Sequence, residues 1–367
     1  MCRWWKCVTI GILALLTLCF SSPAQDPGKE QASALPSSPP SSPAIPIAFL
    51  DSLTRLPGNI SALPASPPIP AANPQTPAKI ALGKMLFFDT RLSRDGSLSC
   101  ASCHDPAKHF SDMRPRAIGI RHTVLGRRTP SVLNAAYNPL QFWDGRANSL
   151  EKQAAEPILS SHEMAVPDEN WLVNRLRQIP NYNRQFTQAF GGPISFVRIT
   201  SAIAAFERTL ITPDSPFDLY IRGAKNALTI QQKRGLILFF GKASCSQCHN
   251  GPNFTDNKFH SLGRLSGEDK TQDLGRYTIS KKLADRGAFK TPSLRNVVDH
   301  TPYMHDGSIA TLSEVIAFYN RGGGDGKKSD LIHPLNLTAN EQEDLLSFLR
   351  SLTGTQPKVE GSGSPRQ

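Results

Sequence analysis

Two stretches of the chain carry apolar side chains at helical spacing behind a capping signal. Residues 229–240 begin with Thr-Ile-Gln-Gln, and Leu236 and Phe240 then fall on one face. Residues 338–352 begin with Thr-Ala-Asn-Glu and continue with five apolar residues at similar spacing. A hydroxyl residue followed three positions later by Glu or Gln is typical of a helix N-terminus. Alternation with a period of two is scarce, so we predict a mainly α fold.

The first apolar run of the chain predicts export. Arg3 and Lys6 precede the apolar run 8–20, and the small residues Ser-Ser-Pro-Ala follow it. This order is typical of a secretory signal peptide, and the run is short for a membrane span. We therefore predict a cleaved signal peptide over 1–24 and a periplasmic protein with no stable membrane span. An uncleaved anchor is the alternative, and lipid attachment at Cys19 is disfavoured because a bulky residue precedes it.

Proline usage separates a tether from the folded chain. Fourteen of the 30 prolines lie between Pro23 and Pro77. We predict a Pro/Ser-rich linker over 25–72 and a disordered tail over 358–367. A chain of 367 residues exceeds one ordinary core, so we expect two folded domains between these segments.

The chain is basic, with a formal net charge of +11. Basic proteins bind nucleic acids, anionic membranes or acidic proteins. The sequence contains no zinc finger, no aromatic RNA-binding signature and no Lys/Arg run longer than a pair. We therefore expect no nucleic-acid partner.

The cysteines fall into two identical patterns once the signal peptide is removed. Three of the seven lie in 1–24, and the other four form Cys100-Ala-Ser-Cys103-His104 and Cys245-Ser-Gln-Cys248-His249. A C-x-x-C-H motif places two thiols for thioether bonds to one porphyrin and an imidazole for its iron. Zinc sites or disulfides are the alternatives, but no further mature Cys completes a zinc shell. We predict two covalently bound c-type haems.

An internal repeat relates the two halves. Thr-Pro-Ser-Val-Leu-Asn ends at Asn134 and Thr-Pro-Ser-Leu-Arg-Asn ends at Asn296, and nine residues beyond each comes Trp143-Asp-Gly or His305-Asp-Gly. The chain therefore looks like a duplicated monohaem domain. In the same register Pro157 replaces Tyr319. Tyrosine can coordinate iron and proline cannot, so one haem is expected to be closed and the other open.

These motifs resemble the bacterial dihaem cytochrome c peroxidase family, and within it the MauG-type branch. The likeness runs from about 73 to 354 and includes both haem motifs, Phe-Trp-Asp-Gly-Arg ending at Arg146, and Pro-Tyr-Met-His-Asp-Gly ending at Gly307. The resemblance implies two cytochrome c-type domains, 73–225 with a peroxidatic haem and 226–357 with an electron-transfer haem.

The resemblance also implies roles for single residues. His104 and His249 are the proximal iron ligands, and Glu163 and Gln153 lie on the distal side of the N-terminal haem. A buried carboxylate can move a proton between the two oxygens of a peroxide. Taken alone, Glu163 is better interpreted as a helix-capping or surface acid, and for Gln153 an ordinary polar helix position is the alternative.

Two further assignments concern electron transfer. Trp143 resembles the tryptophan that lies between the two haems in the family, with a plain core indole as the alternative. Tyr319 resembles the axial tyrosine of the MauG-type branch, where other members have methionine, and a core tyrosine is the alternative. A phenolate stabilises oxidised iron, whereas a thioether favours reduced iron.

The sequence departs from the family at two places. Where many members have a histidine that blocks the N-terminal iron, this chain has Ile120, with His122 two residues on. Either the iron is permanently open or His122 serves as the gate. Arg128 replaces the asparagine that helps bind Ca²⁺, and a guanidinium offers no acceptor atom, which makes a calcium site doubtful.

The sequence thus predicts a periplasmic oxidoreductase that reacts with hydrogen peroxide at the His104 haem. Its oxidising equivalents pass through Trp143 to the His249/Tyr319 haem and then to a donor. The donor is a small cytochrome or cupredoxin, or a protein side chain as in MauG-type maturation of an amine dehydrogenase cofactor. A non-catalytic dihaem electron carrier is the alternative from another class.

Overall fold

A computed structural model describes residues 59–265 and 272–359 of the chain. All of these residues belong to one compact unit. The predicted signal peptide, most of the predicted linker and nearly all of the predicted tail lie outside them. Within the described ranges, no helix is both long enough and apolar enough to cross a membrane.

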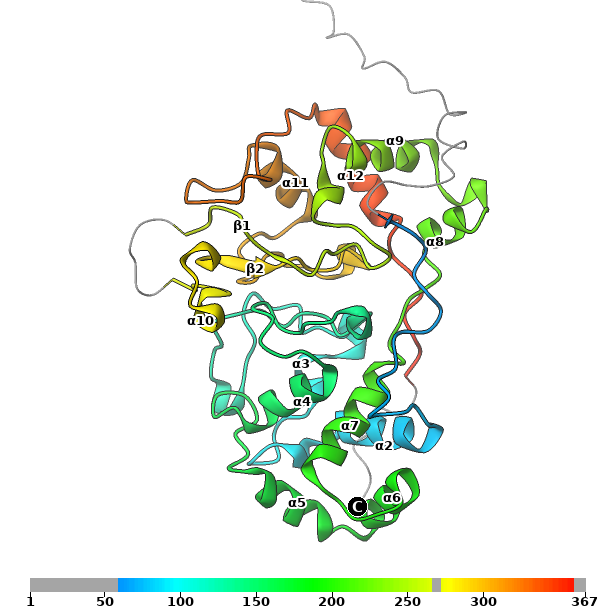
Figure 1. Ribbon diagram of the computed structural model, residues 1–367, viewed down its shortest axis with the longest axis vertical. Coiled ribbons are helices and arrows are strands. Elements are labelled where there is room, and N and C mark those ends of the chain that lie inside the picture. The colour runs from blue at the N-terminus through cyan, green and yellow to red at the C-terminus, as the bar shows by residue number, and fades with distance from the viewer. Residues whose placement is uncertain (1–58, 266–271, 360–367) are drawn as a thin grey trace, which may run out of the picture. The chain divides into compact units, whose positions relative to one another are not determined.

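The described residues are mainly helical (Figure 1), which confirms the predicted fold class. Two three-residue strands, β1 (Phe259–Ser261) and β2 (Ala288–Lys290), pair antiparallel. The α-helices are α2 (Pro77–Phe88), α3 (Cys100–Cys103), α4 (Leu150–Leu159), α5 (Glu169–Arg177), α6 (Pro180–Phe190), α7 (Phe196–Glu207), α8 (Pro216–Ile221), α9 (Ile230–Phe240), α10 (Tyr277–Ser280), α11 (Leu312–Asn320) and α12 (Ala339–Arg350).

Both helices that the capping signals predict are present. Thr229 forms a capping box with Gln232 at the start of α9, and Thr338 forms one with Glu341 at the start of α12. Each box pairs backbone N–H groups that a helix start leaves without partners. Leu352 is buried as expected, but it lies beyond the end of α12 at Arg350.

Two pairs of packed helices form the cores, and each pair is brought close by one glycine. In the first pair, α2 packs on α7, and a Cβ on Gly83 would lie 1.8 Å from the carbonyl oxygen of Ala202. In the second, α9 packs on α12, and a Cβ on Gly235 would lie 2.0 Å from the carbonyl oxygen of Asp344. Any larger residue at these positions would push the helices apart.

Two separate hydrophobic clusters lie on either side of the α7–α8 connection. The first takes its buried residues from between Leu82 and Leu210, and the second from between Phe217 and Leu352 together with Ile60. Two cores suit two domains, with the division of packing falling before α8. The exact boundary at 225/226 stays a prediction.

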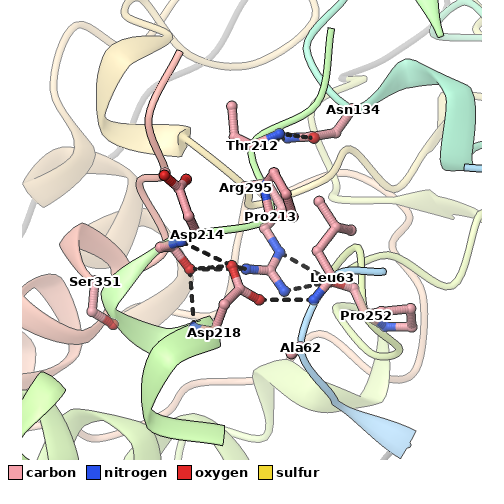
Figure 2. A network of polar contacts seen from close by, with 12 residues as sticks. Ala62, Leu63, Asn134, Thr212, Pro213, Asp214, Asp218, Pro252, Arg295 and Ser351 are labelled. Carbon is pink, nitrogen blue, oxygen red and sulfur yellow. Dashed lines mark hydrogen bonds and ion pairs between the residues drawn. The ribbon is translucent and has the colours of Figure 1, made fainter. Parts of the chain in front are cut away.

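Residues 59–72, the part of the predicted linker that the structure describes, include side chains packed against the folded chain. Ile60 and Leu63 are buried, and the Leu63 amide donates to Asp218 Oδ1 at 2.7 Å. Figure 2 shows this contact beside the ion pair between Asp218 and Arg295, whose atoms are 2.8 Å apart and whose side chains are fully buried. Sequence composition could not reveal that the carboxylate of Asp218 binds the segment around Leu63.

The backbone confirms the internal repeat. Asn134 and Asn296, 162 residues apart, both adopt left-handed conformations with φ of 60° and 56°, and each begins a short 3₁₀ turn. The two asparagines also hydrogen-bond to the same residue, Thr212. Asn134 Nδ2 donates to Thr212 Oγ1 at 2.8 Å (Figure 2), and that hydroxyl donates to Asn296 Oδ1 at 2.7 Å.

Candidate functional site

The two C-x-x-C-H motifs present their histidines in the same way. His104 Nδ1 lies 3.2 Å from the carbonyl oxygen of Phe110, and His249 Nδ1 lies 3.0 Å from that of Phe254. In the tautomer that these contacts favour, Nδ1 carries the proton and donates it to the carbonyl, which leaves the Nε2 lone pair for a metal. Both imidazoles are therefore oriented as axial iron ligands.

A backbone feature that the motif alone does not reveal holds these carbonyls in place. Phe110 and Phe254 are fully buried and have φ of 55° and 51°, in the left-handed region. Bulky residues rarely adopt this conformation, so the surrounding packing must hold it. Burial also lowers the pKa of both histidines, which keeps them neutral and able to bind a metal.

Each motif opens onto its own cavity, of about 450 Å³ at His104 and about 300 Å³ at His249. These volumes lie in the range of cofactor pockets. The wall between them is shared, since Arg128, Pro130, Ser131 and Trp143 line both cavities. The predicted haem sites are therefore neighbours separated by one layer of residues.

The N-terminal cavity collects the residues predicted to act on peroxide. Gln153 on α4 and Glu163 just after it both line this cavity, together with Pro157. The carbonyl of Glu163 accepts the Ile120 amide at 2.8 Å, which fixes the turn that carries the carboxylate. Burial raises the pKa of Glu163 above its ordinary value, so its protonated form persists to a higher pH.

The two candidates for an iron-blocking position differ in placement. Ile120 is buried beneath the Glu163 turn, whereas His122 is exposed and is not among the residues that line the cavity. Of the residues that the structure describes, neither of these two candidates therefore lines the cavity.

The C-terminal cavity contains Tyr319, which lies near the end of α11. Burial raises the pKa of this phenol. Bonding to a cation would lower it again. Other groups that can bind iron line the same cavity, namely Met304, His260, His300, His305 and His333. Geometry alone therefore permits several sixth ligands, and the choice of Tyr319 stays a prediction.

Trp143 lies at the junction of the two halves. Its indole Nε1 donates to the carbonyl of Arg128 at 3.2 Å, and its own carbonyl accepts the Lys290 amide at 2.8 Å. The equivalent residue of the second half, His305, stacks on Phe289 with 3.7 Å between ring centroids. The predicted relay residue thus contacts both halves through its backbone and its ring.

Sequence reasoning missed a second carboxyl group in the N-terminal cavity. Glu207, at the end of α7, is buried and lines this cavity, and its Oε2 has no hydrogen-bond partner among the described residues. Burial raises its pKa to about 8. Glu207 stands in the sequence Ala-Phe-Glu-Arg, and nothing in its spacing indicates that the glutamate faces a cofactor.

The alternatives to haem attachment find little support in the geometry. All four described cysteines are free thiols. One possible metal cluster occurs in the described ranges, formed by Cys248, Asp256 and His260. It uses a cysteine of the haem motif itself, and His260 Nε2 is already 2.9 Å from Asp256 Oδ2.

Comparison with known proteins gives a consistent result. Residues 77–226 match the family model described as di-haem cytochrome c peroxidase. The methylamine utilization protein MauG of Methylorubrum extorquens is 45% identical over 294 residues, covering 79% of this chain and 82% of that protein. The cytochrome c551 peroxidase of Pseudomonas aeruginosa is 40% identical over 287 residues, covering 76% and 80%.

Comparison with solved structures indicates the same family. A MauG-like protein associated with microbial copper homeostasis superposes with a TM-score of 0.73 at 35% identity, covering 82% of this chain and 95% of that one. The diheme peroxidase BthA of Burkholderia thailandensis gives a TM-score of 0.65 at 25% identity, covering 81% and 91%. With its two oriented C-x-x-C-H histidines and paired cavities, this chain belongs to the dihaem cytochrome c peroxidase family.

Proposed function

We propose that the protein is a periplasmic dihaem oxidoreductase that reduces hydrogen peroxide at the haem held by Cys100, Cys103 and His104. The family implies two c-type haems, each of which supplies a redox-active iron when bound. The observation that carries the proposal is the asymmetry between the cavities. Glu163, Gln153 and Pro157 line the first, and Tyr319 lines the second.

Glu163 supplies the proton chemistry in this proposal. As a carboxylate it accepts the proton of the peroxide oxygen nearer the iron, and as a carboxylic acid it returns a proton to the departing oxygen. Two electrons and two protons convert one peroxide into two waters. Gln153 orients the peroxide through its side-chain amide, and Trp143 joins the two haem sites electronically.

The electrons come from a donor, for which two classes are proposed. Likeness to the cytochrome c551 peroxidase favours a small electron-transfer protein, a cytochrome or a cupredoxin. Likeness to MauG, together with a tyrosine in the C-terminal cavity, favours oxidation of a protein substrate in MauG-type cofactor maturation. A phenolate ligand stabilises oxidised iron, and this suits the second class.

Electron paramagnetic resonance of the ferric full-length holoprotein tests the proposal. We expect one high-spin signal from an open iron, one low-spin signal, and loss of the high-spin signal on addition of peroxide. Two low-spin irons without a peroxide reaction would instead identify a dihaem electron carrier. Haem content, measured separately, must give two porphyrins per chain for either result to count.

A further inference from the structure

Arg128 lies in the wall that the two cavities share. Its side chain is buried with 6% exposure, and it lines both cavities. Its backbone amide donates to the carbonyl of His305 at 2.8 Å, and its carbonyl accepts the Trp143 indole N–H at 3.2 Å. The main chain at this residue therefore connects the two halves.

Two of the three guanidinium nitrogens of Arg128 lack a hydrogen-bond partner among the described residues. Its Nε and Nη2 are buried without a hydrogen bond, and no carboxylate in the described ranges forms an ion pair with it. The adjacent Arg127 differs, since it pairs with Asp144 at 2.7 Å and Asp273 at 2.6 Å. Burial lowers the pKa of Arg128 to about 10. The charge of Asp112 opposes this shift, but that carboxylate accepts its hydrogen bonds from Thr129 and from the Arg114 amide. A buried cation with no hydrogen-bonded anion is costly, so the site calls for a further anion.

Two other polar groups surround the same position. His300 lines the C-terminal cavity, and its Nε2 is also buried without a partner among the described residues. Lys290 occupies the position equivalent to Arg128 in the second half, is buried, and lines the same cavity. Its Nζ has one long contact, 3.4 Å to the carbonyl of Thr291. The charge of Asp256 acts on Lys290, but this carboxylate is hydrogen-bonded to His260. The junction thus concentrates donors and positive charge that have no hydrogen-bonded carboxylate among the described residues.

We propose that Arg128 binds the propionate carboxylates of the covalently attached porphyrins at this junction, with His300 as a second donor on the C-terminal side. The inference rests on the two haems of the proposed function. A guanidinium presents several N–H groups in a plane and matches carboxylates in a forked geometry. It also places a fixed positive charge beside both cavities, which stabilises reduced iron and makes a bound calcium ion unnecessary there.

Three variants of the full-length holoprotein test this role. Arg128→Gln removes the charge, Arg128→Lys keeps the charge but not the fork, and Arg116→Gln removes an exposed arginine of the same loop region as a control. The measurements are haem content, the midpoint potentials of both haems, and the propionate bending bands in resonance Raman spectra. The bands report hydrogen bonds to the carboxylates directly and do not depend on catalytic turnover.

We expect Arg128→Gln to lower at least one midpoint potential and to shift a propionate band. Arg128→Lys should shift the propionate band but keep the midpoint potentials close to those of the wild type. Arg116→Gln should change neither the band nor the potentials. A calcium chelator should leave the wild-type spectra unchanged. If Arg128→Gln binds two haems and has the midpoint potentials and propionate bands of the wild type, the proposal is overturned.

Three further outcomes are decisive. Spectra that change only when chloride or phosphate is exchanged would assign a free anion to the site and overturn the propionate assignment. Should Arg128→Gln be recovered without two haems, unchanged bands in Arg128→Lys would overturn it, since one ammonium cannot reproduce a forked contact. If the wild type does not react with peroxide, the proposed function is rejected, but the spectra of the variants still test whether Arg128 binds the propionates.

Discussion

Single residues in equivalent positions give the two cavities different chemistry. In the repeat, Pro157 of α4 is equivalent to Tyr319 of α11, and Trp143 is equivalent to His305. The two residues of each pair share one position of the sequence repeat but differ in their side chains. Proline offers no donor or acceptor to a metal, whereas a phenol offers an oxygen. The duplicated fold therefore supports two unlike haem sites without a change in architecture.

Glu163→Gln tests the proton-transfer role at the residue scale. The amide keeps the shape of the side chain but cannot accept a proton, so peroxide-dependent donor oxidation should fall by about 10²–10⁴-fold with both haems still attached. Because burial raises the pKa of Glu163, the wild-type rate should increase as the pH rises through that value. Steady-state rates against pH measure both effects.

The control for this change is Glu169→Gln, at an exposed position in the first turn of α5. It should retain the wild-type rate and its pH profile. An unchanged rate in Glu163→Gln would remove Glu163 from the mechanism, and a slower rate with an unchanged profile would assign it a positioning role.

Tyr319→Phe tests the axial ligand. Loss of the phenol oxygen should change the absorption and paramagnetic resonance spectra of the C-terminal haem and leave those of the N-terminal haem as they are. Tyr303→Phe is the matched control, because Tyr303 lines the same cavity but its hydroxyl already donates to the carbonyl of Val297 at 3.2 Å. Identical spectra in Tyr319→Phe and the wild type would transfer the ligand role to another residue of this cavity.

At the scale of elements, the sequence predicts two helices whose start and apolar face both have a clear signal. The helix α11 also begins with a capping box, at Thr311 and Glu314, and is not among the predicted helices. The α9 and α12 helices have capping boxes and apolar faces, and both were predicted. The α4 helix has Pro157 in its last turn, and α3 is one turn long, so neither produces a recognisable period. Their positions depend on packing and on the haem motifs rather than on local preference.

The junction between α2 and α6 provides a test of stability. Asp89 follows α2, is buried, accepts hydrogen bonds from Arg91 Nε at 2.9 Å, and also accepts one from the Tyr182 hydroxyl of α6. Burial alone would raise the pKa of Asp89, but the hydrogen bonds from Arg91 and Tyr182 outweigh it, and the pKa is lowered. Hydrogen bonds to a charged group contribute about 2 kcal/mol each.

Asp89→Asn should therefore lower the free energy of unfolding by about 2 kcal/mol at neutral pH. A lowered folded-state pKa means that the wild type holds this stability above the unfolded value of about 3.9 and loses it as the pH falls through the folded value. The difference between the two proteins should accordingly shrink below pH ~4. Urea unfolding of the holoproteins, followed by circular dichroism at several pH values, measures it.

Asp325→Asn, at an exposed aspartate, serves as the control and should match the wild type at every pH. A difference between Asp89→Asn and the wild type that stays constant down to pH ~3 would show that the carboxylate charge contributes nothing to the packing of α2 on α6.

At the scale of the whole molecule, the sequence predicts both haem motifs and the repeat but not the contacts that join the halves. Arg128 and Trp143 bond to the backbone of His305 and Lys290, residues that are distant along the chain. Such pairings depend on how two cores meet, which no local pattern encodes. Arg128 was accordingly recognised as a departure from the family, whereas its burial between two cavities required the fold.

Trp143→Phe tests whether these halves act as one enzyme. Phenylalanine keeps an aromatic ring in the shared wall but loses the indole N–H that donates to Arg128. Peroxide should still change the spectrum of the N-terminal haem at the wild-type rate, because Glu163 and Gln153 are untouched. Oxidation of the C-terminal haem should follow several-fold more slowly, since the residue that lines both cavities is altered.

Rapid mixing of the reduced holoprotein with peroxide, monitored at wavelengths specific to each haem, separates the two phases. Trp171→Phe is the control, because Trp171 lies on α5 beside Arg175 and lines neither cavity. Equal rates of the second phase in Trp143→Phe and the wild type would require another path between the irons. Arg128, which also lines both cavities, would then be the next candidate, and Arg128→Gln in the same experiment would test it.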